Sequence, residues 1–168
     1  MKLRKLQEKD AQGMLEWMHD SNVTKGLQKD FANMTLENCI SFIQSAQDTT
    51  EDMHMAICDN DDIYQGTVSL KHIDTKNKNA EYAISMRSSA QGNGFAGYGT
   101  KEILRIAFEE LGLEKVYLNV LADNPRAIHF YEKMQFQKEA VFEKHIIKEE
   151  PIDLWWYRIF RQEFKDKA

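Results

Sequence analysis

The stretch QGNGFAGYG, residues 91–99, contains a G-x-G-x-x-G pattern formed by Gly92, Gly94 and Gly97. Glycine-rich turns that lead into helices bind phosphate groups, because the backbone approaches closely and the first helical amides have no partner. Apolar residues follow at helical spacing from Ile103 to Leu111. We therefore expect a phosphate-binding loop at the start of a helix. The alternatives are a flexible turn without a ligand and a dinucleotide site.

A dinucleotide site requires glycines directly after a strand and an acidic residue at the end of the next strand, about 20 residues later. Here residues 87–91 (RSSAQ) separate the preceding strand from Gly92. The acid that ends the next strand is Asp123, which is too far away. Two hairpin-like strands also precede the loop, which a doubly wound fold does not predict. These features argue against a dinucleotide enzyme.

Composition limits the class of protein. A chain of 168 residues with 42% hydrophobic residues predicts one domain with one sizeable core. The N-terminus resembles no signal peptide and no apolar run is long enough for a membrane, so we expect a cytoplasmic protein that binds no membrane. A net charge of −5 does not indicate a nucleic-acid binder and weakly favours a cationic substrate. Cys39 and Cys58 lack metal or redox spacing, so we predict no metal and two buried thiols.

Apolar periodicity predicts a mixed α/β domain with the element order β-α-α-β-β-β-α-β-α-β-β. Thr35 and Asn124 are expected to cap two helices, and Pro125 occupies a first helical position, where its missing N–H costs nothing. Residues 136–141 and 154–160 are expected to be two closing strands, separated by the polar segment HIIKEEP. The strands are expected in these ranges: 3–6, 53–59, 63–74, 79–86, 116–122, 136–141 and 154–160.

The central segment resembles the GNAT superfamily of N-acetyltransferases. Residues 91–96 (QGNGFA) are similar to its Q/R-x-x-G-x-G/A loop. Residues 124–136 (NPRAIHFYEKMQF) are similar to its N-x-x-A-x-x-x-Y-x-x-x-G-F pattern, with Gln135 in place of the usual glycine. A strand with Glu81 and a helix ending in FEELGL occur in the family's order. The stretches LEWMHDSNV and DLWWYRIF resemble the branch that acetylates ribosomal-protein N-termini or amino groups on nucleotide-linked sugars.

The resemblance implies an α/β (α+β) GNAT fold with a mixed, mostly antiparallel sheet of six to seven strands and about four helices. It implies a single domain over residues 1–168, with an acetyl-CoA half at about 80–136 and an acceptor side from 8–45 and 137–160. Acetyl-CoA is the implied cosubstrate. The expected cofactor-binding residues are the loop, the strand backbone beside the pantetheine arm, and one asparagine: Gln91, Gly92, Asn93, Gly94, Phe95, Ala96, Gly97, Ile84, Met86 and Asn124.

The implied reaction is direct attack of a primary amine on the acetyl thioester. An alkylammonium with a pKa of about 10.4 is neutral in roughly one molecule in a thousand at pH 7. A base must therefore remove a proton, and Glu81 is the candidate; its other interpretation is an exposed strand carboxylate. Tyr131 matches the family's general acid for the departing thiolate; its other interpretation is a core aromatic that shares a helix face with Ala127 and Met134.

Several points stay open in the sequence. The acceptor is a protein N-terminus, a nucleotide-linked amino sugar or a small amine, and the alternative function is a non-catalytic acyl-CoA-binding regulatory module. A homodimer is a further expectation. Gly99 in the first helical turns has two explanations, close packing or a shifted helix start. The side chains to search for acceptor contacts are Trp17, His19, Asn22, Phe31, Tyr82, Trp155 and Tyr157.

Overall fold

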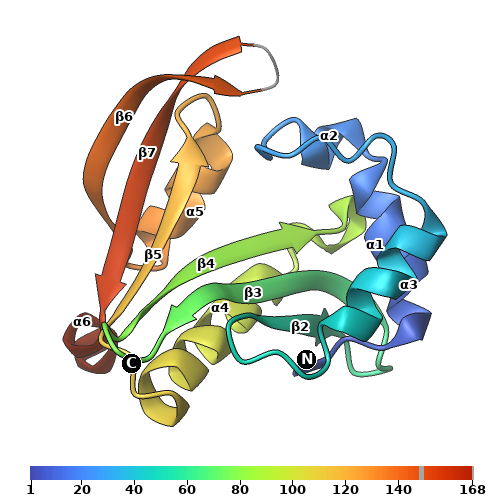
Figure 1. The fold of residues 1–168 in the computed structure, drawn as a ribbon, viewed down its shortest axis with the longest axis horizontal. Helices are drawn as coiled ribbons and strands as arrows, with labels where there is room; N and C mark the ends of the chain where they lie inside the picture. Colours follow the sequence, from blue (N-terminus) through green and yellow to red (C-terminus); the bar gives the residue numbers. More distant parts are fainter. Residues whose placement is uncertain (148–149, 168) are drawn as a thin grey trace.

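The computed structural model describes residues 1–147 and 150–167 as a seven-stranded sheet with helices on both faces (Figure 1). The strand order is β1-β2-β3-β4-β5-β7-β6. Among the described strands, β4 and β5 pair in parallel, and all other neighbouring strands pair antiparallel. This confirms the predicted α/β fold class. The strands are β1 (Lys2–Lys5), β2 (Met53–Cys58), β3 (Tyr64–Asp74), β4 (Asn79–Met86), β5 (Lys115–Leu121), β6 (Gln137–Ile147) and β7 (Glu150–Phe160).

The helices begin where the sequence predicts caps. The Thr35 hydroxyl accepts a hydrogen bond from the Asn38 amide at 3.1 Å, and the Asn124 side chain accepts one from the Ala127 amide at 3.3 Å. The helices are α1 (Ala11–Met18), α2 (Ser21–Thr24), α3 (Leu36–Ser45), α4 (Phe95–Arg105), α5 (Pro125–Lys133) and α6 (Arg161–Lys167), and a π-helical turn, Ile106–Glu110, extends α4. Among the described residues, no helix has the length and apolar character needed to cross a membrane.

Apolar side chains are buried on both faces of the sheet. One cluster lies beneath α4 and α5 and includes Phe108, Leu104 and Tyr157. The other lies beneath α1 and α3 and includes both cysteines, whose thiols are fully buried. Burial raises the pKa of each thiol above its usual value, so neither is activated for nucleophilic chemistry.

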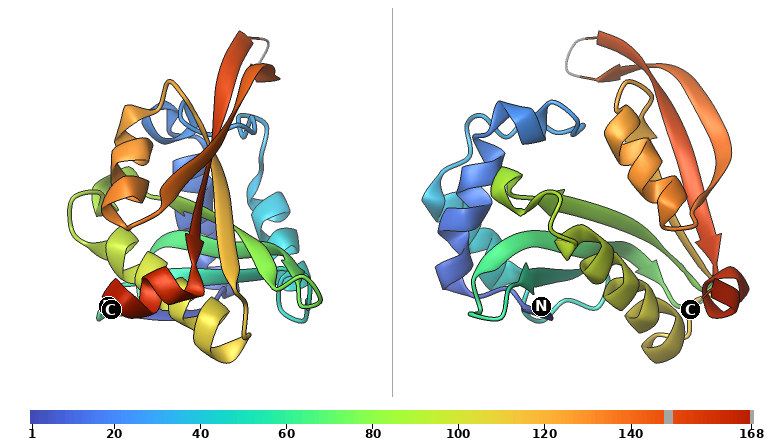
Figure 2. Two further views of the ribbon diagram at one scale, coloured as in Figure 1. Left: turned by 90° about the vertical axis from the view of Figure 1, so that its left-hand side faces the viewer. Right: turned by 180° about the vertical axis from the view of Figure 1, so that it is seen from behind.

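The sheet divides in its middle. β4 and β5 are in register over three pairs only, from Asn79–Lys115 to Glu81–Tyr117. Beyond these pairs β4 stays with β3 as far as Met86, and β5 stays with β7 as far as Leu121. The two strands therefore diverge, as the views in Figures 1 and 2 show. A backbone edge of each strand faces the opening.

The C-terminal hairpin differs from the sequence prediction. The last hairpin is longer than predicted, because β6 continues to Ile147 and β7 begins at Glu150, so HIIKEEP does not separate two short strands. A hairpin continues through polar residues as long as its backbone ladder does.

Gly99 is explained by close packing: a Cβ there would lie 2.3 Å from Cδ1 of the buried Ile57. Gly94 caps α4, which begins at Phe95.

The end of α5 forms a Schellman motif. The Gln135 amide donates to the Glu132 carbonyl and the Phe136 amide donates to the Tyr131 carbonyl, each at 3.0 Å. Gln135 has φ +76°, in the left-handed region that favours glycine. Glycine occupies this position in the sequences that residues 124–136 resemble. The motif holds Tyr131 against Phe136, and the centroids of the two rings lie 6.1 Å apart.

We expect Gln135→Gly to stabilise the protein by about 1 kcal/mol, because glycine removes the strain of a positive φ. For a chain of this size the melting temperature should rise by about 2–4 °C. Gln135→Ala is the matched control, since it removes the side-chain hydrogen bond to Lys133 and keeps the strain. Thermal unfolding of the three proteins measures the difference. An equal gain in both variants would contradict a conformational origin.

Candidate active site

The opening between β4 and β5 is a cleft of about 1420 Å³. Its lining comes from the segment after α2, from β4, from the glycine loop, and from the end of β5 together with α5. Ordinary ligand pockets measure roughly 300–1,000 Å³. The cleft is large enough for an extended cosubstrate and a second, smaller molecule at the same time.

The glycine loop forms one end of the cleft. Gly92 and Gly94 have φ values of +81° and +83°, and a Cβ added at Gly92 or Gly97 would meet no described atom within 4 Å. The loop therefore presents open backbone to the cleft. Gly94 precedes the first amides of α4, which carry partial positive charge at the helix N-terminus. This geometry fits the diphosphate of acetyl-CoA.

Arg126 is a residue that the sequence analysis missed. It lies in the first turn of α5, lines the cleft, and donates a hydrogen bond from Nη1 to Oε1 of Gln91. The chain carries no Lys or Arg between Arg87 and Lys101, so the loop alone supplies no cation. The tertiary fold brings Arg126 beside the loop, 35 residues away in sequence. The sequence did contain one signal for this residue, its position directly after Asn124 and Pro125 in the first turn of a predicted helix.

The structure brings most of the predicted cofactor-binding residues to the cleft. Those that line it are Gln91, Gly92, Gly94, Ala96, Gly97, Ile84, Met86 and Asn124. Asn93 and Phe95 do not belong to the lining. The Asn93 side chain donates to the Ser89 carbonyl at 3.2 Å, and Phe95 packs against the apolar core.

Tyr131 lines the cleft from α5 and is half-buried. Its ring lies edge-on to that of Tyr82, with the centroids 5.9 Å apart, and Tyr82 in turn bonds to the Thr100 hydroxyl at 2.7 Å. Burial raises the pKa of Tyr131 to about 12, so the phenol keeps its proton at neutral pH. In the described part of the chain no residue hydrogen-bonds the Tyr131 hydroxyl. That hydroxyl is available to a ligand.

Glu81 lies where the two strands begin to diverge. It is in register with Tyr117 on β5 and with Lys71 on β3. Its carboxylate forms an ion pair with the Lys71 ammonium at 3.5 Å and lies 3.9 Å from Nε2 of His72. Successive strand residues face opposite sides, so Glu81 and the core residue Tyr82 project from different faces of β4. Glu81 is positioned at the apex of the cleft.

Residues 25–31, which we call the strap, extend from α2 toward α5 (Figure 1), and all of them except Asp30 line the cleft. The Gly26 carbonyl accepts a hydrogen bond from Nδ2 of Asn124 at 3.2 Å, and the Gln28 side chain donates to Oδ1 of Asn119 on β5. A Cβ on Gly26 would lie 2.5 Å from Asn124 Nδ2, so this close approach requires glycine. The strap is thus tied to the far side of the opening.

The other predicted acceptor contacts separate into two groups. Asn22, Phe31 and Tyr82 line the cleft. Trp17 and Tyr157 are buried, and the Trp17 indole donates to the Tyr64 hydroxyl at 2.9 Å. Lys138 Nζ lies 3.3 Å above the ring of Trp155, which does not line the cleft.

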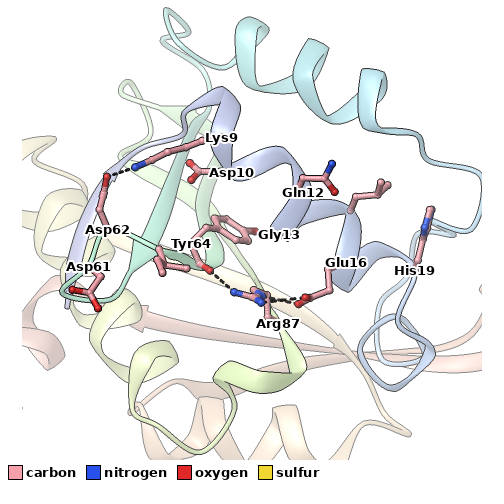
Figure 3. Close-up of a pocket in the computed structure, with 12 residues that line it drawn as sticks. Lys9, Asp10, Gln12, Gly13, Glu16, His19, Asp61, Asp62, Tyr64 and Arg87 are labelled. Carbon is pink, nitrogen blue, oxygen red and sulfur yellow. Dashed lines mark hydrogen bonds and ion pairs between the residues drawn. The ribbon is translucent and has the colours of Figure 1, made fainter.

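His19 lines a second pocket of about 600 Å³ between α1 and the turn before β3. Figure 3 shows Arg87 pointing toward Glu16, with which it forms an ion pair at 2.6 Å, and toward the Tyr64 carbonyl, to which it donates at 3.0 Å. Lys9 pairs with Asp62 there. The charged groups of this pocket largely satisfy one another.

The acetyltransferase (GNAT) domain family matches residues 1–137 of the chain. The chain belongs to this family. The predicted enzyme class of a GNAT protein, an acetyl-CoA-dependent N-acetyltransferase, is thereby confirmed, and acetyl-CoA is its cosubstrate.

Among known GNAT proteins, the chain is 36% identical over 84 residues to spermidine N(1)-acetyltransferase of Vibrio cholerae serotype O1, a match that covers 50% of this chain and 46% of that enzyme. It is 27% identical over 140 residues to spermidine N(1)-acetyltransferase of Escherichia coli K12, which covers 83% and 74% of the two chains.

The crystal structure of spermidine N-acetyltransferase from Vibrio cholerae in complex with CoA and spermine has the same GNAT fold, with a TM-score of 0.88 at 22% identity. The match covers 98% of this chain and 97% of that one. The relatives with a named acceptor act on spermidine, so they do not favour the branch for ribosomal-protein N-termini or nucleotide-linked amino sugars that the sequence resembles.

Proposed function

We propose that this GNAT protein transfers the acetyl group of acetyl-CoA to a small primary amine by direct attack. The observation that supports the proposal is one cleft in which a glycine loop at a helix N-terminus, two diverging strand edges and a tyrosine hydroxyl that no described residue hydrogen-bonds meet. The loop fits a diphosphate, and the strand edges fit an extended amide-bearing arm between them. Tyr131 fits the position of the sulfur at the end of that arm.

The roles follow from the chemistry of a thioester. The amine nitrogen attacks the thioester carbonyl, the C–N bond forms, and the C–S bond breaks. The ammonium proton must leave first, and Glu81, which pairs with Lys71, accepts it directly or through water. Tyr131 donates its proton to the departing sulfur, and the extra proton on the newly bonded nitrogen passes to the Tyr131 oxygen, which leaves a neutral amide and restores the phenol. Because its pKa is about 12, Tyr131 holds its own proton until a better acceptor than water reaches it.

The acceptor is the open part of the proposal. Spermidine is the acceptor named for two relatives and is the first amine to test. A peptide N-terminus and an amino sugar linked to a nucleotide are further candidates. A non-catalytic acyl-CoA-binding module would keep the loop and Asn124 and would acetylate none of these amines.

Thermal unfolding and a thiol-release assay test the proposal. CoA and acetyl-CoA should each raise the melting temperature at concentrations where NAD does not, since only a ligand of the native state stabilises it. Release of free CoA thiol should then depend on added amine across a panel that includes spermidine and peptide N-termini. Stabilisation without amine-dependent thiol release across the panel would favour the binding module, and stabilisation by NAD alone would overturn the assignment of the loop.

A further inference from the structure

We propose that the acceptor amine also carries a negatively charged group, a carboxylate or a phosphate, which the lysines of the strap bind. This inference rests on the proposed function and names its substrate class. It separates this chain from an acetyltransferase of polyamines, whose substrates carry additional ammonium groups and no anion.

The charge of the cleft is the first observation. Its described lining residues include five basic side chains and two acidic ones, although the whole chain has a net charge of −5. Arg126 lies beside the glycine loop, and Lys133 is the last residue of α5. The other three basic residues belong to the strap and to β3: Lys25, Lys29 and Lys71.

The strap holds its two lysines at the cleft. Lys25 and Lys29 flank the two points where the strap is tied across the opening, at Gly26 and Gln28. Asn119, which binds Gln28, projects from the same face of β5 as Tyr117, the register partner of Glu81. The Lys29 ammonium lies 5.4 Å from the centre of the Phe31 ring, which also lines the cleft. Lys25 and Lys29 thus belong to the same cleft lining as Glu81.

Three of the described carboxylates nearby pair with a lysine or accept hydrogen bonds. Glu81 pairs with Lys71, and Asp30, next to Lys29, accepts a hydrogen bond from the Ala32 amide at 2.9 Å. Asp20 accepts from the Asn22 amide and from the Ser88 hydroxyl. Asp123, the second acid of the lining, is exposed in the turn after β5.

A second ammonium on the acceptor would therefore meet lysines, which repel it, whereas an anionic group would meet complementary charge. The same lysines favour the neutral form of the reacting amine, because nearby cations lower the pKa of an ammonium group.

Three amines of equal chain length isolate this effect: 5-aminopentanoate, pentylamine and 1,5-diaminopentane. They present a negative, a neutral and a positive group at the same distance from the reacting nitrogen. We expect kcat/KM to fall in that order, with at least a tenfold difference between the first and the last. Added salt should reduce the difference. 5-Aminopentyl phosphate, compared with 5-aminopentanoate, distinguishes a phosphate from a carboxylate.

Charge reversal in the strap tests the assigned lysines. Lys25→Glu and Lys29→Glu should each shift the ratio of kcat/KM for 5-aminopentanoate over 1,5-diaminopentane toward the diamine by at least tenfold, with an unchanged KM for acetyl-CoA. Lys101→Glu is the matched control, because Lys101 is an exposed residue of α4 outside the cleft lining and carries the same charge change. Its ratio should equal that of the unmodified protein.

The outcomes separate the two proposals. A preference for 1,5-diaminopentane or spermidine overturns this inference and leaves the acetyltransferase function intact, as does an equal shift in the strap variants and the control. Binding of the two acetylated products to the CoA-loaded protein gives the same comparison without turnover. Failure to acetylate any amine, with no difference in product binding, overturns both.

Discussion

Tyr131→Phe is expected to lower turnover with an amine acceptor at least tenfold while the affinity for acetyl-CoA stays nearly unchanged. The substitution removes only the hydroxyl, and the ring keeps its edge-on contacts with Tyr82 and Phe136. Loss of a positioned general acid costs about 10²–10⁴-fold in rate, so the tenfold figure is a lower bound. Initial rates of thiol release give kcat, and a binding titration with acetyl-CoA gives the affinity.

The control for this variant is Tyr98→Phe, which also removes one hydroxyl, from a half-buried residue of α4 outside the cleft lining. Its turnover should remain near that of the unmodified protein. The pH profile adds a second readout. The acid form of Tyr131 is present below a pKa of about 12 and is lost as the pH rises through it, so Tyr131 should cause no fall in rate up to pH 10. Equal turnover in Tyr131→Phe and the unmodified protein would remove Tyr131 from the mechanism.

Gly94→Ala is expected to weaken acetyl-CoA binding about tenfold. A φ of +83° costs a residue with a Cβ about 1–2 kcal/mol, so the loop relaxes away from the conformation that exposes its amides. A tenfold change in Kd corresponds to about 1.4 kcal/mol, which lies within this range. Titration with acetyl-CoA, followed by calorimetry or by the shift in melting temperature, measures the effect.

Gly112→Ala controls for the backbone cost. Gly112 also has a positive φ, +67°, and an added Cβ would meet no described atom within 4 Å, yet it lies outside the cleft lining. Both variants should lose similar stability, because both impose the same kind of strain. Only Gly94→Ala should lose affinity for acetyl-CoA. A similar loss of affinity in both would show that the glycine loop has no special part in binding.

The fold was predictable because its signals are local. Caps at Thr35 and Asn124, the turn at residues 59–62 and the alternation in β4 each determine one element from its own residues. That the sheet is mixed and mostly antiparallel came from the resemblance, and no strand order was predicted. The prediction that HIIKEEP ends two strands was wrong because polarity was taken as a signal for a loop, although a hairpin is defined by its backbone pairing.

The site was predictable only where the sequence carries a pattern. The glycines of the loop and Tyr131 belong to such patterns, and the structure places them around one cleft. Arg126 was missed because its partner Gln91 is distant in the chain. The strap was missed for a related reason: residues 25–31 have no motif, and their importance arises from bonds to Asn119 and Asn124.

The parting of β4 from β5 has a mechanical consequence. Three register pairs, the strap and the packing of α4 and α5 join the half of the molecule built on β1–β4 to the half built on β5–β7. A molecule that lies between β4 and β5 can form backbone hydrogen bonds with both strands where the two strands do not pair with each other. We therefore expect a molecule bound in the cleft to reduce the motion of the two halves relative to each other.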